Sequence, residues 1–305
     1  MGAAMEQIVV LMSTYNGERY LKEAVDSVLQ QTGCQVSLLV RDDGSSDDTV
    51  SILERYREQG MLDYYNGNNV GPAYSFIDLL YHAPAADYYA FADQDDIWDP
   101  DKLATAIDAI REYPTPAVYH SNARLIAANG EEVHRLLHEK EYDLNYLTLL
   151  CSGGLLGCTV VFNRSMLETI IAKEPPAAVR MHDYYLGAVC MSVGGTVVYD
   201  PTPHLGYRQH DSNAIGVAYS AREKVLQKWK QFKNKGTYSI GEQAAQILRD
   251  YSDDMPLERR KECSAVADYD KHIWNTVRIA LSLRTHYSSW KNSLFIRFAI
   301  LFHRR

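Results

Sequence analysis

Three carboxylates stand close together in the segment Asp93–Asp96, whose sequence is Asp-Gln-Asp-Asp. This acidic motif directly follows the apolar run Tyr88–Ala92, which predicts a buried strand. Carboxylates within one turn repel one another unless a cation or basic groups offset their charge. Mg²⁺ and Mn²⁺ take such oxygen ligands, usually one or two carboxylates together with substrate phosphates. The motif therefore predicts a divalent cation that meets a phosphate-bearing substrate, with a solvated turn before the next helix as the alternative.

Two further polar loops follow predicted strands nearer the start of the chain. Ser13–Gly17 comes after Ile8–Met12, and Asp42–Gly44 comes after Val36–Val40. Asp42 is either part of a strand-ending turn that leads into a helix cap, or a carboxylate that accepts hydrogen bonds from a nucleobase or ribose. The chain has neither a GxGxxG nor a GxxxxGK[ST] pattern, so hydride transfer and P-loop chemistry are disfavoured.

The elements that must position these loops alternate between strand and helix. The predicted strands are Ile8–Met12, Val36–Val40, Asp63–Asn66, Tyr88–Ala92, Ala117–His120, Thr159–Phe162 and Thr196–Tyr199. The predicted helices are Tyr20–Leu29, Asp48–Tyr56, Pro72–His82, Pro100–Arg111, Asp183–Ser192, Ala221–Phe232, Gly241–Tyr251 and Leu257–Leu283. This order predicts an α/β fold, with a mostly parallel central sheet flanked by helices and ligands beyond the carboxyl ends of its strands. Only helices are predicted after residue 213, so a C-terminal helical extension is expected.

Composition narrows the class of protein. The 305 residues are 46% hydrophobic and 23% charged, which is typical of a globular chain, and no apolar run reaches the ~20 residues of a membrane span. The five cysteines show no metal-ligand spacing and are expected to be reduced, mostly buried thiols in a cytoplasmic protein. Residues 1–217 carry 14 Lys+Arg against 30 Asp+Glu, whereas residues 218–305 carry 17 against 9. The acidic part argues against nucleic acid as the main partner, and the basic part suits an anionic surface.

Taken together, the motifs resemble glycosyltransferase family 2. The segments that carry the resemblance are Ser13–Gly17, Arg41–Thr49, Phe91–Trp98, Gly153–Asn163, His182–Leu186 and Tyr207–Asn213. The last two are most similar to bacterial rhamnosyltransferases that build rhamnose-rich cell-surface polysaccharides. The resemblance covers residues 6–216.

The resemblance implies a Rossmann-like GT-A fold and an inverting transfer from a nucleotide-activated sugar, with Mn²⁺ or Mg²⁺ as cofactor at a DXD-type motif. It implies Asp183 as the catalytic base, and Asp95 and His210 as metal ligands. The residues expected to bind the nucleotide-sugar are Thr14, Tyr15, Asn16, Asp42, Asp43, Asp93, Gln94, Arg208 and His210. The residues expected to bind the acceptor are Trp98, Gly154, His182 and Tyr184.

The chemistry of the transfer supports a carboxylate base. An acceptor hydroxyl is a weak nucleophile at neutral pH, and a positioned base that takes its proton accelerates the reaction by roughly 10²–10⁴. Asp183 is the candidate, while His182 either binds the acceptor or only supports Asp183 by packing. The aromatic rings of Trp98 and Tyr184 are either platforms for sugar rings or members of the core.

The resemblance implies transfer of L-rhamnose from dTDP-L-rhamnose to a lipid-linked polysaccharide acceptor in cell-wall polysaccharide synthesis. A family 2 enzyme that uses a UDP-sugar (glucose, galactose or N-acetylglucosamine) and a non-catalytic sugar- or nucleotide-binding module are the alternatives. We expect a catalytic domain over 1–217, with a nucleotide-sugar half (1–115) and an acceptor half (116–217), and a basic helical region over 218–305.

The basic C-terminal region has two interpretations. Its last segment, Trp290–Phe302, spaces aromatic and aliphatic residues along one helical face with cations between them, which is typical of an interfacial helix. The segment would then attach the protein peripherally to the inner face of the cell membrane. The alternative is a helix that packs on the catalytic domain or on another subunit, as in a homodimer.

Overall fold

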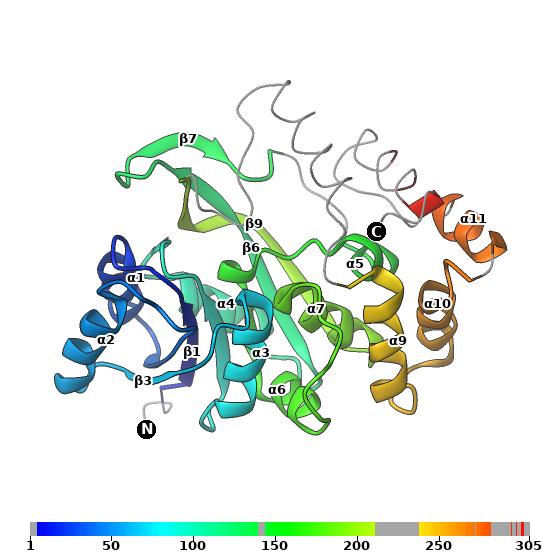
Figure 1. Cartoon of the computed structure of the whole chain (residues 1–305), viewed down its shortest axis with the longest axis horizontal. Helices are drawn as coiled ribbons and strands as arrows, with labels where there is room; N and C mark the ends of the chain where they lie inside the picture. Colours follow the sequence, from blue (N-terminus) through cyan, green and yellow to red (C-terminus); the bar gives the residue numbers. More distant parts are fainter. Residues whose placement is uncertain are drawn as a thin grey trace. The chain divides into compact units, whose positions relative to one another are not determined.

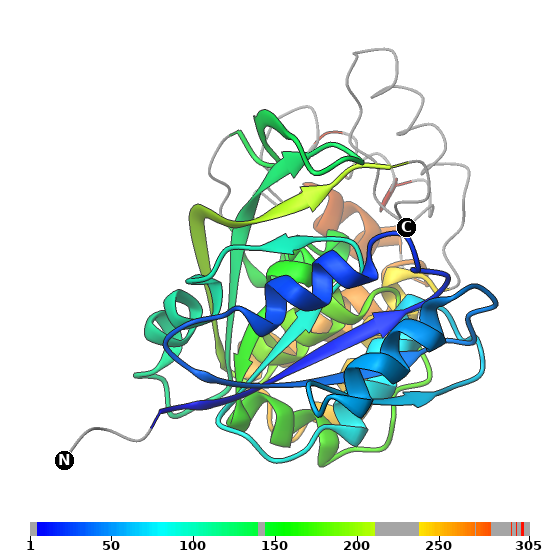
Figure 2. The ribbon, with the colours of Figure 1, turned by 90° about the vertical axis from the view of Figure 1, so that its left-hand side faces the viewer.

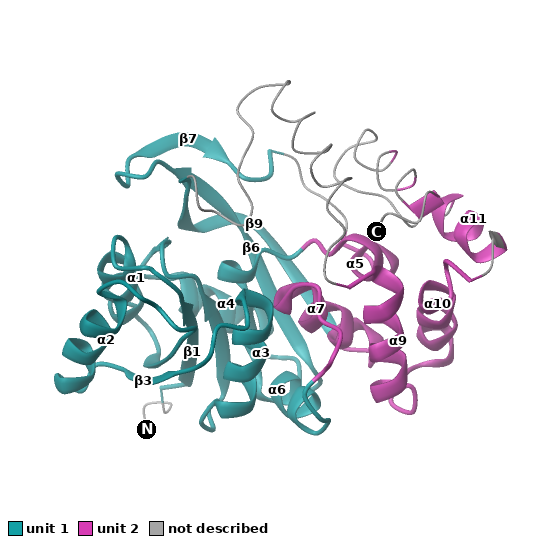
Figure 3. Ribbon diagram, viewed as in Figure 1, with its two compact units in different colours: residues 1–139, 155–175, 196–210 teal, residues 140–154, 176–195, 211–305 magenta. Residues whose placement is uncertain are grey.

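The computed structural model describes residues 5–139, 144–210, 238–271 and 273–281, together with residues 294, 297, 300 and 301. The chain divides into two compact units (Figure 3). The first unit comprises Met1–Glu139, Leu155–Pro175 and Thr196–His210, and the second comprises Lys140–Gly154, Pro176–Gly195 and Asp211–Arg305. The domain boundary expected near residue 217 lies outside the described residues, as do the predicted helix Ala221–Phe232 and most of the segment after residue 281.

The first unit is a sheet with helices around it (Figure 1). Its strands are β1 (Gln7–Thr14), β2 (Gln35–Asp42), β3 (Asp63–Asn66), β4 (Tyr88–Ala92), β5 (Ile97–Trp98), β6 (Ala117–Ile126), β7 (Glu132–Leu136), β8 (Val161–Asn163) and β9 (Thr196–Arg208). Its helices are α1 (Leu21–Leu29), α2 (Thr49–Glu58), α3 (Pro72–His82), α4 (Lys102–Ile110) and α6 (Arg164–Ile171), with a 3-10 turn at Gly157–Thr159.

The strands follow the order β3-β2-β1-β4-β8-β6-β9-β5, and β7 pairs with β6. The first four strands are parallel, and β6 and β9 are also parallel to each other, whereas β8 runs antiparallel to both β4 and β6. Figure 2 views this sheet from another side. All five residues of β4 are buried, as expected for a strand covered on both faces. The predicted α/β fold with a mostly parallel central sheet is confirmed.

The register of the parallel strands brings the predicted loops to one edge. Thr14 lies opposite Asp42 at the ends of β1 and β2, and Met12 lies opposite Ala92 near the ends of β1 and β4. The loops that begin after these strands therefore start side by side. This edge is where an open α/β sheet binds its ligands.

Four predicted strands (β1, β2, β6 and β9) are longer in the structure, β8 begins two residues later than predicted because Thr159 ends the 3-10 turn, and two short strands were not predicted. β6 and β9 extend well beyond Ala117–His120 and Thr196–Tyr199, because the two strands pair with each other through shifts in register. Polar residues interrupt the apolar run of β6 where it continues, and periodicity alone could not follow it. β5 has only two residues and is held by pairing with β9, while β7 pairs with β6.

The second unit is helical in its described part. Its helices are α5 (Tyr146–Ser152), α7 (His182–Ser192), α9 (Ile240–Tyr251), α10 (Leu257–Ala267) and α11 (Ile273–Leu281). The prediction of one continuous helix over Leu257–Leu283 is wrong, because a turn follows Ala267 and the Thr276 hydroxyl donates to the Tyr269 carbonyl beside it. A capping box formed by Ser239 and Glu242 fixes the start of α9. Within the described ranges, no helix has both the length and the apolar character needed to cross a bilayer.

Candidate functional site

The loops after β1 and β4 are joined by one side-chain amide. Gln94 Oε1 accepts from the Tyr15 backbone N–H at 2.9 Å, and Gln94 Nε2 donates to the Tyr15 carbonyl at 3.1 Å. A Cβ at position 17 would overlap the Gln94 amide, so a larger residue in place of Gly17 would displace that side chain. These two hydrogen bonds hold the Gln94 side chain against the Tyr15 backbone. The Tyr15 side chain itself is exposed.

The loops after β1 and β2 are joined in the same way. The Asn16 N–H donates to Ser45 Oγ at 2.8 Å, and Asn16 Oδ1 accepts from the Ser46 N–H at 2.8 Å. Asn16 adopts φ +48°, in the left-handed region that asparagine tolerates better than most residues. The three predicted polar loops thus form one connected surface.

Thr14 and Asp42 are buried together under this surface. Thr14 Oγ1 donates to Asp42 Oδ1 at 3.1 Å, and Asp42 Oδ2 accepts from the backbone N–H groups of Gly44 and Ser45. Each side chain is 1% exposed. The carboxylate of Asp42 therefore fixes the turn after β2. Its predicted contact with the nucleoside stays a prediction.

Asp43 is also buried and paired. It forms a close ion pair with Arg41, and it accepts from the backbone N–H groups of Val70 and Gly71 at 3.0 and 2.9 Å. These bonds hold the loop before α3 against the end of β2. Asp43 therefore stabilises the backbone next to the expected nucleotide site.

Asp95 and His210 are in direct contact. His210 Nε2 lies 2.7 Å from Asp95 Oδ2, although the two residues are 115 positions apart in the sequence. Their side chains are 16% and 12% exposed, so both remain accessible to a small ion. The carboxylate oxygen is the type of ligand that Mg²⁺ and Mn²⁺ take, and the imidazole nitrogen beside it is a common ligand of transition metals. The two residues predicted as metal ligands therefore lie where they could share one ion.

Arg208 lies two residues before His210 and is 1% exposed. Its guanidinium donates to the Asp95 carbonyl at 2.7 Å, to the Ala128 carbonyl at 3.0 Å and to Glu23 Oε2 at 2.6 Å. Its backbone N–H donates to Asp96 Oδ1 at 3.0 Å. Arg208 thus joins the end of β9 to the acidic motif. Its predicted contact with the diphosphate stays a prediction.

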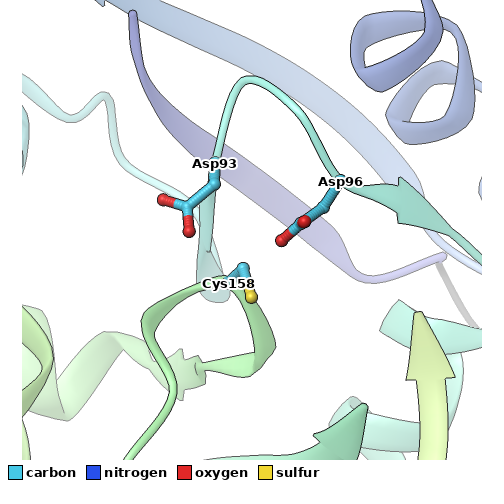
Figure 4. Close-up of side chains that lie close together, drawn as sticks. All are labelled: Asp93, Asp96 and Cys158. Atoms are coloured by element: carbon cyan, nitrogen blue, oxygen red, sulfur yellow. The ribbon is translucent and has the colours of Figure 1, made fainter. Parts of the chain in front are cut away.

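A second group of side chains lies at the base of the acidic motif. Asp93 and Asp96 stand at the two ends of the loop, and Cys158 comes from a separate segment, the 3-10 turn (Figure 4). One ligand atom from each lies within 4.8 Å of the other two. Burial, followed by the charge of Asp95, raises the pKa of Asp96 to about 7, and burial also raises the pKa of the Cys158 thiol. Asp96 and Cys158 therefore tend to hold protons rather than to accumulate charge.

A buried lysine and a buried tryptophan lie beside that group. Lys102 is 1% exposed, and its Nζ lies 3.5 Å from the centroid of the Trp98 ring. Among the described residues, Lys102 Nζ has no hydrogen-bond partner. Burial lowers the pKa of Lys102 to about 7. Trp98 is only 4% exposed, which places this expected acceptor-binding residue in the core of the first unit.

The remaining expected residues belong to the second unit. His182 and Asp183 open α7, both are 3% exposed, and Asp183 Oδ1 accepts from the Tyr184 N–H at 2.8 Å. Negative charge is favoured in the first turn of a helix. Burial lowers the pKa of His182 to about 3, so the imidazole is neutral at physiological pH. Gly153 packs so closely on the Tyr184 ring that a side chain there would overlap it.

Four neighbours of the site were not predicted. They are Tyr20, Glu23, Lys102 and Cys158. Cys158 lies inside one of the segments that carry the family resemblance, which was the only available signal. The other three occur in helical patterns, where periodicity assigns a residue to a face but not to a partner distant in the sequence.

Comparison with known sequences gives a consistent result. The profile described as Glycosyl transferase family 2 matches residues 9–172. The chain is 28% identical over 234 residues to "dTDP-rhamnosyl transferase RfbG" of Shigella flexneri, an alignment that covers 70% of this chain and 78% of that protein. An uncharacterised protein of Mycobacterium tuberculosis is 30% identical over 223 residues, covering 70% of this chain and 62% of that protein.

Two solved structures share the fold. Mannosyltransferase PcManGT from Pyrobaculum calidifontis, in complex with GDP-Man and Mn²⁺, gives a TM-score of 0.59 at 16% identity, covering 98% of this chain and 75% of that chain. S. aureus TarS 1-349 in complex with UDP-GlcNAc gives a TM-score of 0.53 at 16% identity, covering 97% and 90%. These similarities establish the GT-A fold.

Proposed function

Because the chain belongs to glycosyltransferase family 2 and is a glycosyltransferase, we propose that it transfers L-rhamnose from dTDP-L-rhamnose to a lipid-linked saccharide acceptor, with inversion and with the help of Mn²⁺ or Mg²⁺. The 28% identity to a dTDP-rhamnosyl transferase is the observation that carries the choice of donor. The contact between Asp95 and His210 supports the metal. A UDP-sugar is the alternative donor, since TarS, which shares the fold, was solved with UDP-GlcNAc.

The proposed reaction is a single displacement. The acceptor oxygen bonds to the anomeric carbon as the bond from that carbon to the diphosphate oxygen breaks, which inverts the configuration. Asp183 accepts the proton of the acceptor hydroxyl. The nucleoside diphosphate leaves with the bonding electrons.

The metal would be held by Asp95 and His210. When bound, it would supply positive charge that neutralises the leaving diphosphate. The two side chains already lie within 2.7 Å of each other, so the chain itself brings both ligands to one point. The loops clamped by Gln94 and Asn16 would hold the nucleoside next to them.

The decisive experiment is a donor panel with product analysis. Purified protein is offered dTDP-L-rhamnose and UDP-sugars with a lipid-linked acceptor, with Mn²⁺ or after chelation, and the anomeric configuration of the product is determined by NMR. We expect transfer from dTDP-L-rhamnose, loss of activity after chelation and recovery with Mn²⁺ or Mg²⁺. Transfer from a UDP-sugar alone would replace the proposed donor.

A substitution of the base separates an enzyme from a binding module. Asp183→Asn keeps the size of the side chain and is expected to lower kcat by roughly 10²–10⁴ while donor binding is retained. Donor affinity is measured by calorimetry, and turnover is measured by release of nucleoside diphosphate. An Asp183→Asn variant with full turnover would show that Asp183 is not the base.

A further inference from the structure

Arg208 is a buried residue whose guanidinium joins three separate segments of the chain. At 1% exposure, it is the largest of the fully buried side chains, and each guanidinium nitrogen has an acceptor within 3.0 Å. Two of these acceptors are backbone carbonyls, those of Asp95 and Ala128, and the third is the carboxylate of Glu23. A guanidinium engaged on all three nitrogens is held in one orientation. Its contacts therefore define where the Asp95 backbone lies.

Tyr20 extends this arrangement to the second expected metal ligand. The Arg208 guanidinium carbon lies 4.7 Å from the centroid of the Tyr20 ring, and the His210 ring stacks on Tyr20 at 5.0 Å with an interplanar angle of 29°. Tyr20 directly precedes α1, and Glu23 lies in its first turn. The start of α1 thus contacts both Arg208 and His210.

Glu23 is the one charged partner among these acceptors of Arg208. Glu23 is 59% exposed on its side chain, whereas Arg208 is 1% exposed, so the pair connects a buried cation to the surface. Removing the carboxylate would take the charged acceptor away from Nη2 of a buried guanidinium, which is expected to weaken the hold on the orientation of Arg208. Metal ligands depend on such outer contacts for their orientation.

We propose that Glu23, Arg208 and Tyr20 form a positioning unit that sets the geometry of Asp95 and His210 and thereby the affinity for the divalent cation. This inference rests on the proposed function, because it takes Asp95 and His210 as the metal ligands. Arg208 acts through its neighbours: it orients the Asp95 backbone directly and the His210 ring through Tyr20. In this arrangement Glu23 is a permanent partner of Arg208.

The test is a titration of the protein with Mn²⁺ in the absence of any donor, in which free ion is followed by electron paramagnetic resonance. Glu23→Gln is expected to weaken Mn²⁺ binding by roughly tenfold, as typical losses of outer contacts do. Tyr20→Leu, which keeps an apolar side chain but removes the ring, is expected to weaken binding in the same direction. Glu54→Gln, which removes the carboxylate of a surface pair with Arg57, is the matched control and is expected to bind Mn²⁺ like the wild type.

Two results would overturn the inference. Unchanged Mn²⁺ affinity in folded Glu23→Gln, with folding checked by circular dichroism, would show that the unit does not control the site. Tighter binding of dTDP by Glu23→Gln would show instead that Glu23 is a placeholder, which a diphosphate displaces from Arg208. Asp95→Asn tests the metal site separately from the positioning unit. Normal Mn²⁺ affinity in that variant would show that Asp95 is not a metal ligand.

Discussion

Lys102 is a cation enclosed by the core of the first unit, beside a tryptophan ring and the base of the acidic motif. A lysine in this position is held by the ring and by the charges of Asp96 and Cys158 when they ionise. Burial nevertheless lowers the pKa of Lys102 to about 7 from an ordinary value of 10.5. Between pH 7 and pH 10.5, Lys102 is mostly protonated in the unfolded chain and mostly deprotonated in the folded chain. Lys102 therefore makes folding more favourable as the pH rises from 7 to 10.

The variant Lys102→Met tests this pH dependence. The free energy of unfolding of the wild type, relative to Lys102→Met, is expected to rise between pH 7 and pH 10 by on the order of 3 kcal/mol, at roughly 1.4 kcal/mol for each pKa unit. Urea denaturation at pH 7, 8.5 and 10 measures the difference, in which the titration of groups distant from Lys102 cancels. Lys22→Met, at a lysine that is 74% exposed, is the control and should show no such change. Parallel curves for the wild type and Lys102→Met would contradict the interpretation.

The strands β1 to β4 and the polar loops after β1, β2 and β4 were predicted because their signals are local. β3, α3 and β4 have the predicted bounds, since turn residues or prolines stand at their ends. The convergence of the three polar loops also followed from strand order alone. The pairing of β5 with β9 depends on a partner distant in the sequence, and no local pattern shows it.

For the candidate site too, the sequence indicated some of the residues in contact and gave no signal for others. The family motifs single out Asp95 and His210, and the structure places the two side chains in contact. Glu23 gave no signal in the sequence, because its role depends on the position of Arg208, 185 residues away. The burial of Trp98 was one of two interpretations, and only packing could decide between them.

The clamp between the loops after β1 and β4 can be tested through Gly17. Gly17→Ala is expected to displace the Gln94 amide and to break its two hydrogen bonds with Tyr15, which lowers the stability by about 1–2 kcal/mol and raises the KM for the donor. Thermal unfolding and initial rates at varied donor concentration measure the two effects. If the clamp is responsible, Gly17→Ala adds little to Gln94→Ala, and additive effects in the double variant would refute this coupling.

At the scale of the whole molecule, charge and exposed apolar surface meet in the C-terminal part of the chain. Residues 271–305 carry seven Lys+Arg and no Asp or Glu. On α11, Trp274 and Leu281 are 80% and 66% exposed, and the exposed Arg278 lies between them at helical spacing. An exposed tryptophan beside cations favours an anionic lipid surface. We propose peripheral membrane attachment through this face, while the segment Trp290–Phe302 that first indicated it lies largely outside the described residues.

Vesicle flotation tests the attachment. The wild type is expected to float with phosphatidylglycerol vesicles and much less with phosphatidylcholine vesicles, and binding should weaken as salt rises. The double variant Trp274→Ser and Leu281→Ser should lose most of the bound fraction. Met61→Ser, at an exposed apolar residue of the first unit, serves as the control. If all three proteins float to the same extent, Trp274 and Leu281 do not form the membrane contact.

The distance in sequence between Asp95 and His210 also matters during synthesis. The ribosome makes Asp95 first, and 115 further residues must be added before His210 exists. At about 5–20 residues per second, this interval lasts roughly 6 to 23 s. Throughout that time the nascent chain has Asp95 but no His210, so the proposed metal site is incomplete. If Asp95 and His210 hold the cation as proposed, its capture by both ligands would be one of the last events in the maturation of the first unit.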